Sequence, residues 1–371
     1  MSPTDVPSAT ALRADQIRSG ELILACADLA PTVSFFTKRL GFRVDAISPA
    51  DAPTSALLSG FGVRIRLDPT AATDPGSLRL GCALAPGEAV PEPVVAPNGT
   101  RVEFVDADPP LSIPDGRQSF VVNRLADHAD FGVGRAGMRY RDLIPDRFGG
   151  RFIASHIAIP DGGPVPDYVH FHKIRFQMIF CRAGWVKVVY EDQGPPFVLE
   201  AGDCVLQPPE IRHRVLEASP GLEVVELACP ATHQTLADHE ITLPTAELRP
   251  DRDFGGQRFV RHVASAATWA PWRHPGFEYS DLGLQDATGG IAGVRVVRSC
   301  GASATPPGRH DAELLFTFVL AGGLTVQCAG QPAEALEAGD SFTIPAESEF
   351  SFAGCSADVS LLEVSLPPLP R

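Results

Sequence analysis

Hydrophobic and polar residues alternate in short runs along most of this chain, and Gly and Pro separate the runs. The segment 21–28 alternates like a strand. The segment 31–42 has the period of a helix, with Val33, Phe36 and Leu40 on one face. Further runs of strand type follow at 42–47, 54–62 and 63–68. We therefore predict a small α+β region of order βαβββ at the start of a mostly β protein.

The remainder of the chain contains two copies of one unit. GMRYRDL begins at Gly137 and GFEYSDL begins at Gly276, and AGDCVLQPPE from Ala201 is matched by AGDSFTIPAE from Ala338. A linker rich in Pro and Asp, DADPPLSIPDG, precedes the first copy. These features predict three domains, at residues 1–107, 108–245 and 246–371.

The first copy carries a group of residues with the spacing of a metal site. His170 and His172 lie two apart on a predicted strand, so their imidazoles project from one face. Gln177 can add an amide oxygen, and His213 can add a third imidazole after the next turn and strand. Three imidazoles suit Fe, Zn, Ni, Mn or Cu, and spacing alone does not choose among them.

This stretch resembles the two cupin motifs, HxH(x)3-4E(x)6G and G(x)5PxG(x)2H, over residues 163–217. Gln177 stands where the motif has Glu, and Glu210 stands where it has its second Gly. The resemblance implies two tandem cupin barrels (double-stranded β-helix, jelly-roll), the first holding one divalent transition metal through His170, His172, Gln177 and His213. The second barrel is expected to be degenerate, because Gly308, Leu315 and Phe350 stand at three of the four ligand positions.

The first 107 residues resemble a truncated vicinal-oxygen-chelate (glyoxalase-like) domain. The resemblance rests on the βαβββ order and on the segments SFFTKRLGF and PNGTRVEFVD. Glu21 replaces the common first-strand His of that family, and Glu103 resembles its late acidic ligand. Because so incomplete a set would hold a metal weakly, we expect no catalytic metal there.

The neutral amide at Gln177 bears on the ligand expected in the first barrel. A carboxylate would offset one of the metal's two charges, whereas an amide leaves the dication to attract an anion such as an enolate or a carboxylate. Arg175, two residues before Gln177, and Tyr168, two residues before His170, are therefore predicted to bind substrate.

Charge and composition narrow the classes of partner. Asp and Glu number 45 against 31 Lys and Arg, a net charge of −14, which disfavours nucleic acid and anionic membranes. The sequence shows neither a membrane-spanning run nor a signal peptide, so a cytoplasmic location is expected. The eight dispersed cysteines are expected to be small buried residues, and a homodimer is left open.

The leading functional prediction is a metal-dependent, dioxygenase-type cupin oxidoreductase acting on a small enolisable or carboxylated metabolite, with Fe favoured. One alternative is a metal-dependent isomerase or lyase, in which the metal only polarises a carbonyl. A third is a bicupin that binds or senses a small molecule without catalysis.

Overall fold

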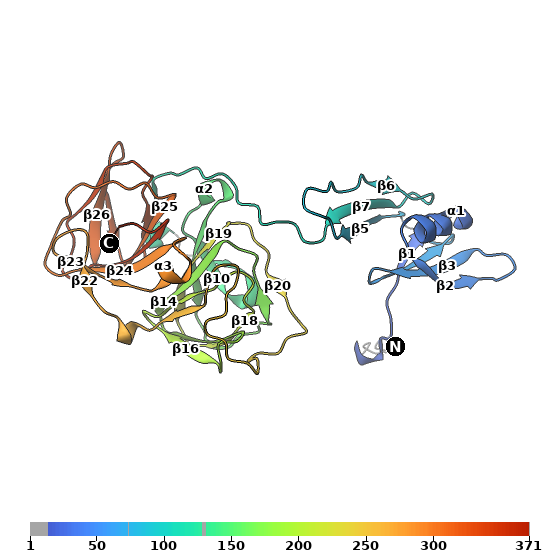
Figure 1. Cartoon of the computed structure of the whole chain (residues 1–371), viewed down its shortest axis with the longest axis horizontal. Helices are drawn as coiled ribbons and strands as arrows, with labels where there is room; N and C mark the ends of the chain where they lie inside the picture. Colours follow the sequence, from blue (N-terminus) through green and yellow to red (C-terminus); the bar gives the residue numbers. More distant parts are fainter. Residues whose placement is uncertain (1–13, 73, 128–130, 371) are drawn as a thin grey trace, which may run out of the picture. The chain divides into compact units, whose positions relative to one another are not determined.

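A computed structural model describes residues 14–72, 74–127 and 131–370, and the chain forms two compact units that divide between Pro110 and Leu111. Figure 1 shows both units, coloured along the sequence. No helix among the described residues is long and apolar enough to cross a membrane.

The first unit has the βαβββ order that the hydrophobic pattern predicts. It contains η1 (Ala14–Gln16), β1 (Leu22–Ala25), α1 (Leu29–Ser34), η2 (Phe35–Arg39), β2 (Arg43–Ser48), β3 (Ser55–Gly60) and β4 (Val63–Asp68). The sheet order is β1-β4-β3-β2, and β5 (Ser77–Cys82), β7 (Arg101–Asp106) and β6 (Val94–Val95) form a second sheet. Phe36 is fully buried in the core, with Val33 and Leu40 packed around it. Gly41, at φ +82°, ends the helical segment.

The first half of the second unit consists of two sheets. One has the order β21-β17-β14-β19-β11-β10-β9, and the other has the order β16-β15-β18-β13-β20, with β12 paired to β18. The bounds are β9 (Gly132–Val133), β10 (Arg139–Asp142), β11 (Ile153–Ile159), β12 (Gly163–Pro164), β13 (His170–Phe171), β14 (Phe176–Ala183), β15 (Trp185–Tyr190), β16 (Phe197–Glu200), β17 (Cys204–Leu206), β18 (His213–Ala218), β19 (Leu222–Cys229), β20 (Leu236–Ala237) and β21 (Val260–His262). Short helical turns lie at η3 (Leu125–Asp127), η4 (Arg135–Gly137) and α2 (Arg147–Gly150).

The second half repeats this plan with a smaller outer sheet. Its sheets have the orders β22-β23-β24-β30-β25-β28-β8 and β27-β26-β29. The bounds are β8 (Val121–Asn123), η5 (Ala264–Ala266), β22 (Ala270–Pro271), β23 (Phe277–Asp281), α3 (Leu284–Ala287), β24 (Gly293–Ser299), β25 (Leu314–Ala321), β26 (Gly323–Cys328), β27 (Glu334–Glu337), β28 (Ser341–Thr343), β29 (Phe350–Ala353) and β30 (Ser360–Leu366).

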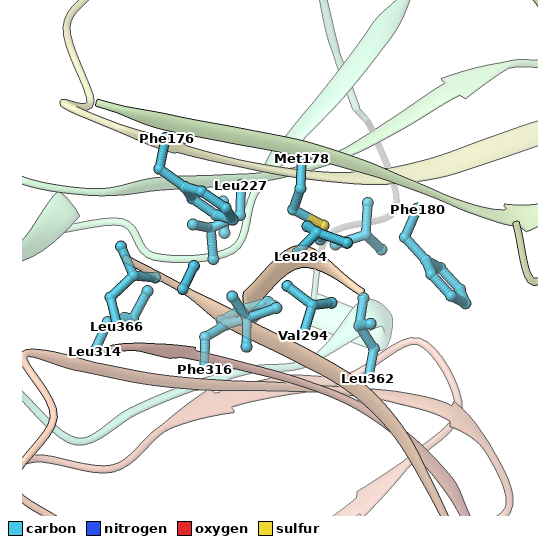
Figure 2. Close-up of a cluster of buried hydrophobic side chains, with 14 of the residues drawn as sticks. Phe176, Met178, Phe180, Leu227, Leu284, Val294, Leu314, Phe316, Leu362 and Leu366 are labelled. Carbon is cyan, nitrogen blue, oxygen red and sulfur yellow. The ribbon is translucent and has the colours of Figure 1, made fainter. Parts of the chain in front are cut away.

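The two halves pack through their seven-stranded sheets. On β14 the side chains of Phe176, Met178 and Phe180 point toward the other half, where Phe316 of β25 and Leu362 of β30 meet them (Figure 2). All five are almost fully buried. Strand β14 is thus apolar on this face and lines the interior of its own half with the alternate residues, which explains its nearly unbroken hydrophobic run.

Each half also borrows one strand from the other copy of the repeat. Strand β8 precedes the first copy but pairs with β28, and β21 precedes the second copy but pairs with β17. The two AGD turns fasten these strands: Asp203 accepts the backbone N–H of Ala264, and Asp340 accepts that of Leu125, both at 2.8 Å. A cut between residues 245 and 246 therefore separates the two copies of the sequence but divides a sheet.

Neither half is a barrel closed by hydrogen bonds among the described residues; each is a pair of facing sheets. The mostly β class is confirmed, and the paired sheets are consistent with the double-stranded, jelly-roll architecture that the cupin resemblance implies. Large apolar side chains fill the interior of the second half, among them Phe342, Phe350 and Phe352. In the first half, the corresponding space holds a cavity.

Candidate metal centre

Three histidines converge inside the first half. His170 lies on β13 directly opposite His213 on β18, and His172 follows β13 by one residue. All three are buried, with exposed fractions of 8% or less. One nitrogen from each ring lies within 4.8 Å of those of the other two, and among the described residues no other group of three or more His, Cys, Asp or Glu does so.

Backbone carbonyls fix the tautomer of each imidazole. The Nδ1 atoms of His170, His172 and His213 lie 2.8, 3.1 and 3.0 Å from the carbonyl oxygens of residues 168, 234 and 211. A carbonyl only accepts hydrogen bonds, so each Nδ1 carries the proton and each Nε2 keeps its lone pair. This arrangement of a ligand nitrogen backed by a carbonyl is typical of metal-binding histidines.

Burial keeps the imidazoles neutral. Loss of solvent lowers the pKa of all three, that of His172 to about 3 and that of His213 well below its usual value. The neighbouring imidazoles and Arg135 lower the pKa of His213 further. Three neutral nitrogen donors are therefore available at pH 7 without removal of a proton.

The amide of Gln177 has a buried oxygen that no protein group uses. Its Nε2 donates to Oε1 of Glu226 at 2.5 Å, and its buried Oε1 has no hydrogen-bond partner. A carboxylate accepts and does not donate, so Glu226 binds the nitrogen of the amide and leaves its oxygen free. An unpartnered buried oxygen on the cavity wall fits a bound cation, as do the three Nε2 atoms.

The cavity beside these groups is small and largely apolar. Its volume is about 100 Å³, and its wall includes Met138, Ile157, Val188, Leu199 and Val224. The polar lining residues besides the histidines are Arg135, Tyr140, Gln177, Tyr190, Gln207, Arg214 and Glu226. Such a wall excludes bulk water and leaves a few polar groups to orient a ligand.

The two residues predicted to bind substrate, Arg175 and Tyr168, do not line this cavity, although the ring centre of Tyr168 lies 5.9 Å from that of His170. Nη1 of Arg175 lies 2.5 Å from Oε1 of Glu313, which belongs to the other half, and Arg151 of the first half pairs with the same carboxylate. Tyr168 is 40% exposed and contributes its backbone carbonyl to His170. The cation beside the histidines is Arg135, because its Nη2 lies 3.1 Å from Nε2 of His170.

Sequence reasoning missed Arg135 and Glu226. Glu226 could have been found from the sequence. In the apolar strand 222–229 it lies at even spacing from Leu222 and Val224, so its side chain points to the same, interior side of the strand. Arg135 lies in a turn about 35 residues before the histidines, and no motif marks it.

In the first unit, the two carboxylates at the expected ligand positions are already paired. Glu21 accepts two hydrogen bonds from Arg66, at 2.8 and 3.0 Å. Glu103 accepts from Arg79 and Arg101. These ion pairs engage both residues in bonds across neighbouring strands.

Comparison with known proteins supports the fold. No protein-family model matches the chain, and neither does any curated protein sequence. Among solved structures, it is similar to salicylate 1,2-dioxygenase from Pseudaminobacter salicylatoxidans, with a TM-score of 0.51 and 16% identity over 68% of this chain and 86% of that one. It is also similar to a putative glyoxylate-induced protein from Pseudomonas aeruginosa (TM-score 0.51, 12% identity, 72% and 95% covered). A mutant of Bacillus subtilis oxalate decarboxylase OxdC gives a TM-score of 0.50 with 11% identity, over 70% and 81%.

At such identities the similarity concerns the fold. These structural neighbours are cupin-type proteins and include a dioxygenase and an oxalate decarboxylase. The chain therefore shares the fold of these neighbours, in agreement with the jelly-roll architecture that the histidine motif indicates.

Proposed function

We propose that this chain is a metal-dependent cupin enzyme that performs dioxygenase-type chemistry on a small carboxylated or enolisable metabolite. The observation that carries the proposal is the donor set: three clustered, neutral Nε2 atoms and the unpartnered Oε1 of Gln177, from residues that all line one small cavity. A dioxygenase and an oxalate decarboxylase among the structural neighbours agree with it.

The residues present suit one divalent transition metal, held by His170, His172 and His213 with Gln177. When bound, such a metal supplies Lewis-acid polarisation of a substrate oxygen and, if it is redox-active like Fe, electrons for reaction with O2. The apolar wall keeps bulk water from the reacting groups.

A specific observation favours a second candidate, a non-redox isomerase or lyase. Glu226 lines the cavity and, among the described residues, its side chain is hydrogen-bonded through Gln177, so its carboxylate is placed to exchange a proton with a bound substrate. Such proton transfer is what isomerisation or lyase cleavage requires. This mechanism would work equally well with zinc.

For the first unit we infer a truncated glyoxalase-like module that binds no catalytic metal. The ion pairs on Glu21 and Glu103 support this, since a metal would have to displace Arg66, Arg79 and Arg101 from them. We expect the fragment 111–371 to hold as much metal as the full chain.

Elemental analysis of the full chain purified without a His tag tests metal binding. We expect about one transition metal per chain and nearly none in the double variant His170→Ala, His172→Ala. His233→Ala is the matched control, because this imidazole lies 5.2 Å from that of His172 but is not part of the donor cluster. Full metal content in the double variant would refute the proposed site.

Metal substitution separates the two chemistries. The Fe(II) form should bind nitric oxide, an O2 surrogate, with an electron paramagnetic resonance signal that sharpens when substrate is added. The zinc form should be inactive. Equal anaerobic turnover by the zinc form would replace the oxygenase proposal with the isomerase or lyase.

A further inference from the structure

Arg135 places a cationic group directly against the donor cluster. It begins the turn η4, and its side chain is 29% exposed at the cavity wall. Its Nη1 is paired with Oδ1 of Asp167, and its Nη2 lies 3.1 Å from Nε2 of His170. The guanidinium also lies 5.8 Å from the ring centre of Tyr168. One end of the guanidinium is thus anchored while the other points to the histidines.

The anchor of Arg135 is rigid. The side chain of Asp167 is fully buried, and its Oδ2 accepts the backbone N–H of Val215 on β18 at 2.9 Å. Strand β18 is also the strand that carries His213. The carboxylate that holds Arg135 is therefore tied to the same framework as the donor nitrogens, so the guanidinium keeps its position relative to them.

The contact between Arg135 and His170 cannot persist beside a bound metal. The Nδ1–H of His170 is committed to a carbonyl, so Nε2 is the acceptor of the Arg135 N–H and also the atom available to a metal. The single lone pair of His170 Nε2 can accept the Arg135 N–H or bind a metal, but not both at once. Once a metal takes it, Arg135 has an unpartnered N–H and a positive charge close to a dication, which repel each other.

The geometry points to Arg135 as the residue that binds the carboxylate of the ligand and couples its binding to that of the metal. A carboxylate between the guanidinium and the metal accepts the freed N–H and separates the two positive charges. Metal and carboxylate then raise each other's affinity by one common factor. This inference rests on the proposed metal site and adds to it a substrate class, a small organic carboxylate, and the residue that recognises it.

The test measures zinc affinity of the full chain, by competition with a chromophoric chelator in carboxylate-free buffer. Zinc is titrated alone, with acetate, and with acetamide as an uncharged analogue of similar shape. A charge-assisted hydrogen bond gained only when both ligands are present should tighten zinc binding about tenfold in acetate, after correction for zinc acetate in solution. Acetamide should leave the affinity unchanged.

Variants at position 135 assign the effect. Arg135→Gln should bind zinc alone at least as tightly as the parent, because a competitor for His170 is gone, but should respond less than twofold to acetate. Arg135→Lys retains a cation for Asp167 without the planar fork, so it covers the case in which the Gln variant fails to fold, and it should show a weakened acetate response. Arg139→Gln makes the same change at an exposed arginine of β10 that does not line the cavity; it is the matched control and should keep the full response.

The outcomes separate this inference from the proposed function. If the parent binds zinc but acetate changes nothing, or if the position-135 variants keep the tenfold response, the role of Arg135 is overturned and the metal site stands. If the parent does not bind zinc, Fe(II) or another divalent transition metal, both fail together.

Discussion

The substitution Gln177→Glu separates the sequence-based view of the site from the structural one. From the motif alone, a carboxylate at this position should strengthen metal binding, because it adds negative charge beside the ion. The structure adds a second carboxylate: Oε1 of Glu226 lies 2.5 Å from the Nε2 atom that the substitution replaces with oxygen. Without metal, the variant therefore places two carboxylates against each other on neighbouring strands.

The size of the effect follows from that distance. If the side chains relax to about 4 Å, two unit charges at an effective dielectric of about 20 repel by about 4 kcal/mol. One carboxyl of the pair then keeps its proton, because the repulsion raises the pKa of the pair above the usual value of about 4.3 for Glu. From about pH 4.3 up to that raised pKa, the folded variant binds more protons than the unfolded chain. Its unfolding free energy should therefore fall by up to about 4 kcal/mol as the pH rises through this window, and stay low above it.

Urea unfolding of the metal-free protein at pH 5 and pH 8 measures this change. The three tryptophans, Trp185, Trp269 and Trp272, all lie in the second unit, so their fluorescence reports that unit alone. The double variant Gln177→Glu, Glu226→Gln restores one amide and one carboxylate and should regain stability at pH 8. Zinc should rescue the single variant more than the parent. If the single variant is as stable as the parent at pH 8, these side chains do not face each other as described.

Two further predictions concern the second half. Phe316→Ala removes a fully buried ring between the halves and should lower the unfolding free energy of the second unit by about 3–5 kcal/mol in the same urea assay. The control Leu248→Ala, at a residue 66% exposed, should change this free energy by less than about 0.5 kcal/mol. Equal effects would show that the cluster between the halves does not stabilise the unit. Burial and Arg273 lower the pKa of His274 from 6.5 to about 4, so stability that is present above pH 6.5 is lost as the pH falls toward 4. His274→Gln should reduce that loss by up to about 3 kcal/mol in urea unfolding measured between pH 7 and pH 4. An unchanged dependence of stability on pH would contradict the lowered pKa.

The parts of the fold that could be predicted from the sequence are those set by local period and by repetition. The βαβββ order follows from runs of period 2 and 3.6, and the strand β14 follows from a continuous apolar run. The meeting of His170, His172 and His213 could also be expected, because same-face spacing and paired turns place them on adjoining strands. That they hold a metal remains a proposal.

The motif's departures from consensus became intelligible only in the structure. Glu210, which replaces a motif Gly, has φ +61°, and Glu347 at the matching place in the second copy has φ +62°. This left-handed conformation is the one that favours glycine, so the consensus Gly reflects backbone geometry. The strand exchange could not be read from the repeat, because β8 and β21 carry no pattern that tells which copy they pair with.

The charge of the site depends on residues that lie far apart in the sequence. These residues set the number of negative charges expected on the ligand. Considering Gln177 alone, the sequence leaves a full dication and favours an anionic ligand such as an enolate or a carboxylate, without fixing the number of its charges. The cavity contains Glu226 beside the amide, and Arg135 beside the histidines with Asp167 as its partner. Arg214 also lines the cavity, but it is exposed, so solvent screens its charge. The two carboxylates then offset all but one of the positive charges of a dication and Arg135. A ligand with a single carboxylate therefore neutralises the loaded site, and a second one would be buried without a partner, at a cost that selects against dicarboxylates.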